Sequence, residues 1–132
     1  DFNGKKLLLV EDNKINSEIA KRLLELKGFE VALAGNGVDA IEKFTKSKVG
    51  EFAVILMDIR MPFMDGLEAT RTIRTIRKAD ATRIPIVAMS ANAFEEDVQK
   101  SLASGMNAQP TKPLDAELMF STLEKLIFNR KE

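Results

Sequence analysis

The sequence contains no histidine and no cysteine. Without histidine, the chain has no imidazole to activate a serine, bind a metal ion or carry a phosphoryl group. Without cysteine, it has neither disulfides nor thiolate metal sites, which agrees with a cytoplasmic location, even if a longer parent protein is attached to a membrane. Chemistry carried out by this chain must therefore use carboxylates, hydroxyls and lysine.

The sequence also lacks a long hydrophobic run and an excess of one charge. No apolar run approaches the roughly 20 residues that span a bilayer, and the first residues lack the apolar stretch of a signal peptide. The 20 basic and 20 acidic residues cancel, whereas nucleic-acid-binding proteins usually carry a basic excess. We therefore expect no direct contact with nucleic acid or a membrane. The local basic cluster is expected to be a solvated helix face: Arg71, Arg74, Arg77 and Lys78.

The chain of 132 residues is long enough for one buried core and too short for two. We assign residues 1–132 to a single domain with its core at about 5–129. The first five or so residues and residues 129–132 are expected to be loose ends.

Four continuous apolar runs are expected to be strands: Leu7–Val10, Val31–Ala34, Val54–Met57 and Ile84–Met89. Runs that do not alternate with polar residues are typical of strands buried on both faces of a parallel sheet. A fifth strand is predicted at about 107–111, at an edge because Pro110 cannot donate to a ladder. Segments with helical spacing separate the runs, so the fold class is α/β with right-handed crossovers.

The first predicted helix carries apolar residues on one face, namely Ile15, Ile19, Leu23 and Leu26. Gly28 follows where a glycine commonly ends a helix. Ile15, with Leu114, either offers an apolar patch to a partner helix or is buried in the ordinary way. Further helices are predicted at about 37–47, 66–78, 93–104 and 115–129, with sequences resembling capping boxes from Asp65 and Asn92.

Side chains that can carry chemistry follow the predicted strands where each one ends. Glu11 and Asp12 follow the first strand, Asp58 the third, Ser90 the fourth and Lys112 the fifth. Because ligands bind beyond the carboxyl ends of parallel strands, we expect these residues to share one site. A hard cation such as Mg²⁺ would relieve the repulsion among three carboxylates and leave room for phosphate oxygens. This set of groups suits phosphoryl transfer, which depends on positioning and electrostatics.

Asp58 is the better candidate for the nucleophile because it stands alone at the end of the central strand. The adjacent Glu11 and Asp12 have the arrangement of metal ligands. A turn that contains Pro62 follows Asp58 and holds the acceptor loop before the next helix begins.

Five segments carry a resemblance to a known family: LLVEDN (8–13), MDIRMPFMDG (57–66), AMSA (88–91), GM (105–106) and KP (112–113). In this order they resemble the receiver domain of two-component response regulators, over about residues 5–129. The segments 13–16, 58–66 and 90–93 most resemble receivers attached to hybrid sensor histidine kinases. The resemblance thus favours a module of a hybrid kinase over a stand-alone phosphorelay receiver.

The resemblance implies a flavodoxin-like doubly wound five-stranded parallel sheet in the order 2-1-3-4-5, with helices on both faces. It implies that Asp58 is the phosphoacceptor and that Mg²⁺, or Mn²⁺, binds Glu11, Asp12, Asp58 and the backbone carbonyl of Arg60. Ser90 and Lys112 would hold the phosphoryl group, and the peptide bond before Pro113 would be cis.

Neighbouring residues would tune the reaction. Ala91 is small enough to admit a phosphodonor, and Arg60 and Asn92 could adjust hydrolysis of the acyl phosphate. The family usually has an aromatic residue three positions before the lysine, where this chain has Gln109. This chain therefore lacks the aromatic residue whose reorientation usually accompanies switching, but it keeps the residues that phosphorylation needs.

The implied partner is a phosphohistidine-bearing histidine kinase or histidine phosphotransfer domain. Because the chain has no histidine, the donor must be another domain or protein. The receiver would catalyse its own phosphorylation and dephosphorylation, without an external substrate, and switch the face formed by the fourth helix and fifth strand. The sequence leaves open which stimulus and output the domain serves and whether it forms a weak homodimer. It also leaves open whether the domain passes the phosphoryl group on in a relay or acts as a phosphate sink.

Four other functions fit the sequence less well. A phosphatase of the haloacid dehalogenase type would need an aspartate two residues beyond the nucleophile, where this chain has Arg60. A flavodoxin-like electron carrier would need a hydroxyl- and glycine-rich loop after the first strand, where this chain has Glu11, Asp12 and Asn13. A nucleotide switch would need a phosphate-binding Gly-x-x-x-x-Gly-Lys-Ser/Thr loop, which is absent. A pseudo-receiver that only binds would usually lack an acceptor or ligand residue, and none is lost.

Overall fold

The computed structural model describes residues 2–58, 64–89 and 116–128, which form four parallel strands and four helices. In chain order they are β1 (Lys6–Val10), α1 (Lys14–Leu26), β2 (Glu30–Ala34), α2 (Gly37–Lys46), β3 (Val54–Asp58), α3 (Gly66–Thr75), β4 (Ile86–Met89) and α5 (Ala116–Phe128). The strand order is β2-β1-β3-β4, which confirms the predicted doubly wound fold for these strands. The predicted helix at 93–104 and strand at 107–111 lie outside the described residues.

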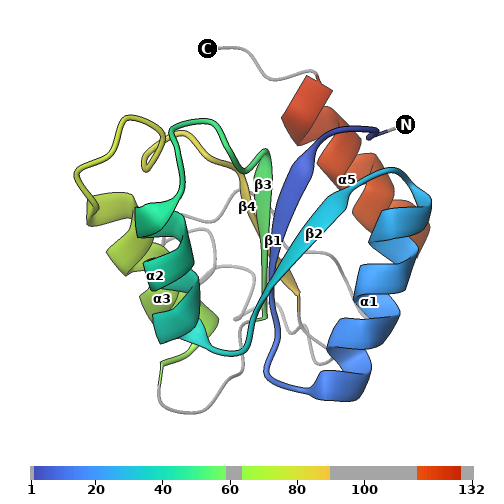
Figure 1. Ribbon diagram of the computed structural model, residues 1–132, viewed down its shortest axis with the longest axis horizontal. Coiled ribbons are helices and arrows are strands. Elements are labelled where there is room, and N and C mark those ends of the chain that lie inside the picture. Colours follow the sequence, from blue (N-terminus) through green and yellow to red (C-terminus); the bar gives the residue numbers. More distant parts are fainter. Residues whose placement is uncertain (1, 59–63, 90–115, 129–132) are drawn as a thin grey trace.

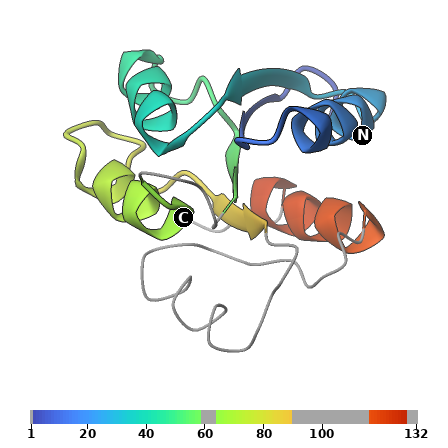
Figure 2. The same ribbon diagram turned by 90° about the horizontal axis from the view of Figure 1, so that it is seen from below.

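The helices cover both faces of the sheet. Helices α2 and α3 lie on one side, and α1 and α5 lie on the other (Figure 1). The view from below shows the same two layers of helices around the strands (Figure 2). Among the described helices, none is long and apolar enough to cross a membrane.

Residues of the strands alternate between two hydrophobic cores, which explains why the apolar runs are continuous. In β1, Leu8 and Val10 belong to the core under α2 and α3, whereas Leu7 and Leu9 belong to the core under α1 and α5. All four side chains are fully buried. A strand covered on both faces by helices needs apolar residues at every position, so the prediction from the runs is confirmed.

The helix ends show where local sequence signals were sufficient. Helix α1 ends at Leu26, and Gly28 has a φ of 105°, a left-handed conformation that favours glycine. Asp65 caps α3 by accepting a hydrogen bond from the Glu68 N–H, at 2.9 Å. Helix α3 nevertheless ends at Thr75 rather than at the predicted residue 78, because Ile76 is extended, with a ψ of 138°.

The expectation that the basic cluster is a solvated face is wrong for two of its four members. Arg74 donates to the carbonyl oxygens of Ala81 and Ile84, at 3.0 and 2.7 Å. The side chain of Lys78 is only 9% exposed. Its ammonium pairs with Asp80 and lies 4.1 Å from the ring centroid of Phe44.

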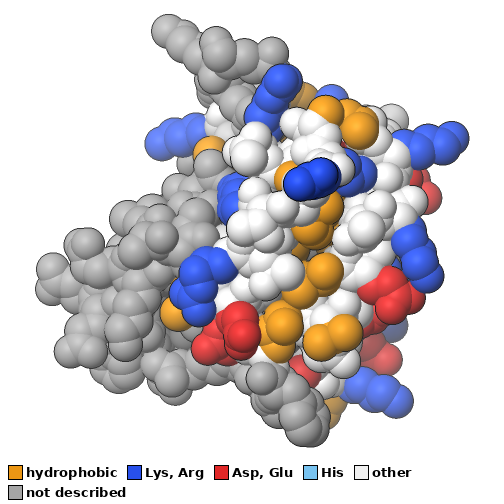
Figure 3. Space-filling model, turned by 90° about the vertical axis from the view of Figure 1, so that its left-hand side faces the viewer, with side chains coloured by type: hydrophobic (Ala, Val, Ile, Leu, Met, Phe, Trp, Pro, Cys, Tyr) orange, Lys and Arg blue, Asp and Glu red, His pale blue; other side chains and the backbone are white. Residues whose placement is uncertain are grey.

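Arg71 and Arg77, the other two members of the cluster, are exposed as expected. On the side of the molecule that carries α2 and α3, basic and acidic side chains are interspersed around a line of hydrophobic ones (Figure 3). The visible part of this face is therefore not uniformly basic.

The expectation of a loose N-terminus is also wrong from residue 2 onward. Phe2 is only 3% exposed and belongs to the core under α1 and α5. Its N–H donates to the carbonyl of Lys27 at 2.9 Å. The folded unit therefore begins before the first strand.

Candidate metal and phosphoryl site

The pairing of β1 with β3 positions the acidic residues at the carboxyl edge of the sheet. Val10 lies opposite Met57 in the register, so Glu11 and Asp58 follow at the same level. The N–H of Glu11 donates to the carbonyl of Ala34 at 3.0 Å, which extends the contact between β1 and β2 by one residue. The backbone that carries these carboxylates is thus fixed by the centre of the sheet.

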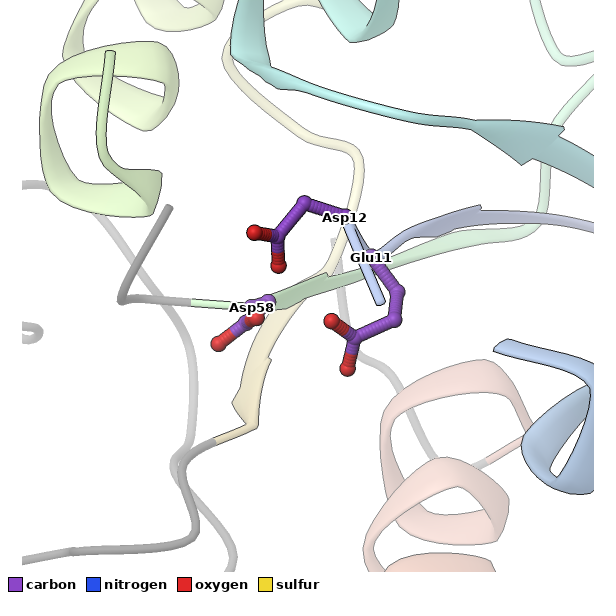
Figure 4. A group of neighbouring side chains, drawn as sticks. All are labelled: Glu11, Asp12 and Asp58. Carbon is purple, nitrogen blue, oxygen red and sulfur yellow. The ribbon is translucent and has the colours of Figure 1, made fainter. Parts of the chain in front are cut away.

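The structure brings three of the predicted site residues together. One carboxylate oxygen from each of Glu11, Asp12 and Asp58 lies within 4.8 Å of the other two. Glu11 and Asp58 are half-buried, and Asp12 is exposed. Figure 4 shows the three side chains around a common space, with Glu11 and Asp12 coming from the end of β1 and Asp58 from the end of β3.

The crowding of these carboxylates changes the acidity of Glu11. The pKa of the Glu11 carboxyl is raised from 4.5 to about 8, mainly by burial and also by the neighbouring Asp58 and Asp12, against the N–H of Asn13, which lowers it. That N–H donates to Glu11 Oε2 at 3.1 Å. Without a cation, Glu11 is therefore expected to hold a proton at neutral pH.

The donor set fits a small, hard divalent cation. Mg²⁺ prefers oxygen ligands at about 2.0–2.1 Å, so two adjacent ligands in an octahedron lie about 3 Å apart and two opposite ones about 4 Å apart. The spacing of the three carboxylates, at most 4.8 Å, needs only small side-chain movements to reach this range. A shared cation would also balance charge that otherwise keeps a proton on Glu11.

Other predicted site residues lie outside the described residues, and their roles stay predictions. These residues are Arg60, Ser90, Ala91, Asn92, Gln109, Lys112, Pro113 and Leu114. The strand that leads to Ser90 is described: β4 ends at Met89, which lies opposite Asp58 in the register.

Two residues that follow strands at the carboxyl edge of the sheet have roles that sequence reasoning missed. Asn13 accepts a hydrogen bond from the Asn16 N–H at 3.0 Å and so caps α1, while its own N–H binds Glu11. Gly37 lies where a Cβ would be 3.0 Å from both Cγ and the carbonyl oxygen of Met64. The capping residue Asn13 was detectable as an asparagine before a helix, whereas the close approach of Gly37 depends on a segment 27 residues away.

The fold and the site together define a class: a doubly wound α/β domain with three acidic residues at the carboxyl edge of its central strands. The response regulator receiver domain family matches residues 7–124. The chain belongs to this family and is a receiver domain of two-component systems. This confirms the resemblance that the five sequence segments carry.

Relatives of this chain include histidine kinases that are much longer than it is. It is 38% identical over 124 residues to hybrid signal transduction histidine kinase I of Dictyostelium discoideum, covering 92% of this chain and 7% of that protein. It is 33% identical over 154 aligned residues to probable histidine kinase 1 of Oryza sativa subsp. indica, covering 95% of this chain and 16% of that protein. The chain thus spans a small part of each of these relatives.

Solved structures show the same fold. The receiver domain of the sensor histidine kinase PA1611 from Pseudomonas aeruginosa PAO1, which has a magnesium ion coordinated in its active site cleft, has a TM-score of 0.83 and 35% identity, covering 94% of this chain and 98% of that one. The chemotaxis protein CheY4 of Vibrio cholerae has a TM-score of 0.82 and 28% identity, and the match covers 92% of this chain and 98% of that one. In the first of these relatives, the cleft holds the kind of ion that the acidic cluster fits.

Proposed function

We propose that Asp58 accepts a phosphoryl group from a phosphohistidine and that Glu11, Asp12 and Asp58, with the backbone carbonyl of Arg60, bind Mg²⁺ or Mn²⁺. The observation that carries the proposal is the meeting of three carboxylates at the carboxyl edge of β1 and β3. The donor histidine belongs to another domain or protein, because this sequence has none. The family and its relatives imply partners of the two-component phosphotransfer kind.

Asp58 suits the role of nucleophile better than its two neighbours. It ends β3, the strand between β1 and β4, and its half-buried carboxylate lies at the centre of the edge. A carboxylate oxygen of Asp58 attacks phosphorus, the P–N bond breaks, and its electron pair returns to the donor imidazole. The product is an acyl phosphate on Asp58, whose charge of about −1.5 to −2 can then bias the conformation of the domain.

The remaining residues stabilise charge at the site. A bound divalent cation supplies positive charge next to the phosphoryl oxygens. Ser90 donates a hydrogen bond to one of these oxygens, and Lys112 pairs with another. Ala91 leaves space for the donor, and Arg60 and Asn92 adjust the lifetime of the product. By the resemblance to the family, the peptide bond before Pro113 is expected to be cis, and Gln109 stands where the family usually has an aromatic switch residue.

The biological setting follows from the relatives as a proposal. We assign residues 1–132 to a single receiver domain, and we place it in the cytoplasm as a module of a hybrid histidine kinase. Its own reaction is phosphorylation and dephosphorylation of Asp58, with no external substrate.

A test with two phosphate sources separates a receiver from a magnesium-dependent phosphatase. With acetyl phosphate and Mg²⁺, we expect a mass increase of one phosphoryl group per chain. No increase is expected when a chelator is present from the start. With a generic phosphomonoester, we expect no sustained release of phosphate. Many turnovers of the phosphomonoester would contradict the proposal and favour the phosphatase.

The donor is proposed to dock over α1. Ile15 and Ile19 are 69% and 52% exposed, while the buried residues of the helix are Ala20 and Leu24 on its other face. Ile15 lies four residues after Glu11, so this apolar patch begins beside the acidic site. Exposed apolar side chains in a row are typical of an interaction surface, and a helix of the donor would suit a row with helical spacing.

Ile19→Lys is expected to slow phosphotransfer from the protein donor by about tenfold or more, because a charge replaces an apolar contact. Labelling by acetyl phosphate should not change, since a small donor needs no docking surface. The measurement is the rate of transfer from a purified phosphohistidine domain that phosphorylates the wild type.

Val38→Lys is the matched control for this experiment. Val38 is 57% exposed but lies on α2, on the opposite side of the sheet. Equal losses in the two variants, or a loss only at Val38, would contradict docking over α1.

A further inference from the structure

The N-terminal segment is an ordered part of the domain that lies outside the matched family region, which begins at residue 7. The N–H of Lys5 donates to the carbonyl of Phe2 at 3.0 Å, and Gly4 between them has a φ of 82°. This hydrogen bond closes a tight turn, and glycine permits its left-handed residue. Residues 2–5, called the latch below, are therefore held in one conformation.

The latch joins the loop after α1 to helix α5 through aromatic rings. Phe2 stacks on Phe29 with a centroid distance of 4.4 Å and an interplanar angle of 14°. Phe2 also contacts two rings of α5, with centroid distances of 6.3 Å to Phe120 and 5.7 Å to Phe128. Such ring pairs add to the stabilisation that burial alone gives.

Two lysines reinforce this cluster of rings. The Lys5 ammonium lies 5.6 Å from the centroid of Phe128, and that of Lys27 lies 5.3 Å from the centroid of Phe120. Both distances are within the range of cation–π attraction. The latch, the loop after α1 and the end of α5 are thus fastened to one another.

Helix α5 runs between the latch and the carboxyl edge of the sheet, where the acidic site lies. It begins at Ala116, four residues after Lys112, and runs back along the sheet to the end where the N-terminus lies (Figure 1). In its middle, Leu123 is fully buried in the same core as Leu7 and Leu9. A helix of 13 residues is about 20 Å long and moves largely as a rigid body, so displacement at its first turn reaches the rings of Phe120 and Phe128.

We propose that the latch is coupled to the phosphorylation state of Asp58 through α5 and opens when Asp58 is phosphorylated. This inference rests on the proposed function, because it takes Lys112 to pair with the phosphoryl group and so to draw the first turn of α5 toward the site. The pull on α5 separates both of its rings from Phe2, that of Phe120 near the start of the helix and that of Phe128 at its end. The position of the chain entering the domain would then report the state of the acceptor.

A single fluorescent residue tests the coupling, because the chain contains no tryptophan or tyrosine. Phe2→Trp places an indole in the cluster of rings, and Val49→Trp is the control, since Val49 is 60% exposed and lies outside the latch. Both variants are treated with acetyl phosphate and Mg²⁺, and the phosphorylated fraction is measured by mass. We expect the equilibrium constant for opening of the latch, measured by acrylamide quenching of the indole at position 2, to rise about fivefold or more on phosphorylation. Quenching at position 49 should not change.

The outcomes separate the two proposals. A protein that is phosphorylated but shows unchanged or reduced quenching at position 2 overturns the latch and leaves the proposed function intact. Equal changes at positions 2 and 49 also overturn it, since they would indicate a general rearrangement. A protein that takes up no phosphoryl group overturns the proposed function, and the latch with it.

A second variant covers the case in which Phe2→Trp does not fold. Phe128→Trp changes a ring that is 48% exposed on the last turn of α5 and is therefore expected to be tolerated. The same increase in quenching is expected there.

Discussion

Asp58→Asn is expected to lower labelling by acetyl phosphate by about a thousandfold or more, because the amide is no longer a nucleophile. The shape of the side chain is nearly unchanged, so the fold should be kept. The measurement is the phosphorylated fraction by mass spectrometry, with wild type and variant at equal Mg²⁺ concentration. Reduction of the labelled wild type with borohydride, followed by peptide mapping, should locate the acyl phosphate at position 58.

Asp39→Asn provides the same chemical change at another carboxylate. Asp39 lies in the first turn of α2, where it pairs with Lys43 at 3.6 Å, and it does not belong to the acidic cluster. This control should be labelled like the wild type. Labelling of Asp58→Asn at the wild-type level, or a label mapped to Glu11 or Asp12, would contradict the assignment of the acceptor.

The fold was largely predictable because its main signals are local or depend only on the sheet. Continuous apolar runs predicted strands buried on both faces, and the two cores that share the residues of β1 confirm this. The meeting of Glu11 and Asp58 followed from one rule, that parallel strands end at a common edge. Caps such as Asp65 and Gly28 were predictable because their partners lie within a few residues.

The errors concern side chains whose partners are distant in sequence. Phe2 is buried by rings from α5, more than a hundred residues away, and no local pattern distinguishes it from an apolar residue in a loose terminus. Lys78 is buried because its ammonium donates to the carbonyl of Phe44 at 3.0 Å and to the hydroxyl of Ser47 at 2.6 Å. Helical spacing alone assigned it to a solvated face, since that spacing says nothing of the neighbouring loop.

The apolar face of α1 shows a different limit. The predicted apolar face consisted of Ile15, Ile19, Leu23 and Leu26, but spacing cannot tell whether such a face is turned inward or outward. The structure exposes three of these residues, with Leu26 83% exposed, leaves Leu23 half-buried, and buries Ala20 and Leu24 instead. The exposed row of large side chains is therefore a feature of the surface, for which docking gives a reason and core packing does not.

The second large effect is expected in the pH dependence of metal binding. Because the pKa of Glu11 is raised to about 8, a proton competes with the cation for this carboxylate below that pH. The apparent affinity for Mg²⁺ should therefore fall as the pH is lowered from 8 to 6, by up to about tenfold per pH unit. Titration calorimetry at several pH values, in buffers of different ionisation enthalpy, measures both the affinity and the proton released.

Glu11→Gln removes the group that titrates, and Glu18→Gln serves as the control. Glu18 is an exposed carboxyl on α1 outside the acidic cluster. Glu11→Gln should bind Mg²⁺ more weakly at pH 8 and lose most of the pH dependence between 6 and 8, whereas Glu18→Gln should behave like the wild type. An unchanged pH dependence in Glu11→Gln would show that another group competes with the metal.

The same shift has a consequence for the stability of the metal-free protein. The pKa of Glu11 rises from an ordinary value of 4.5 to about 8 on folding, so the folded state binds the proton more tightly than the unfolded chain does. Stability is then lost as the pH rises from 4.5 to 8, because the slope of the unfolding free energy with pH is negative wherever the folded state holds more protons. Glu11→Gln should therefore melt at a higher temperature than the wild type at pH 8 in the presence of a chelator, with the difference shrinking toward pH 5. Added Mg²⁺ should reverse the order at pH 8, since the cation stabilises the protein that keeps the carboxylate.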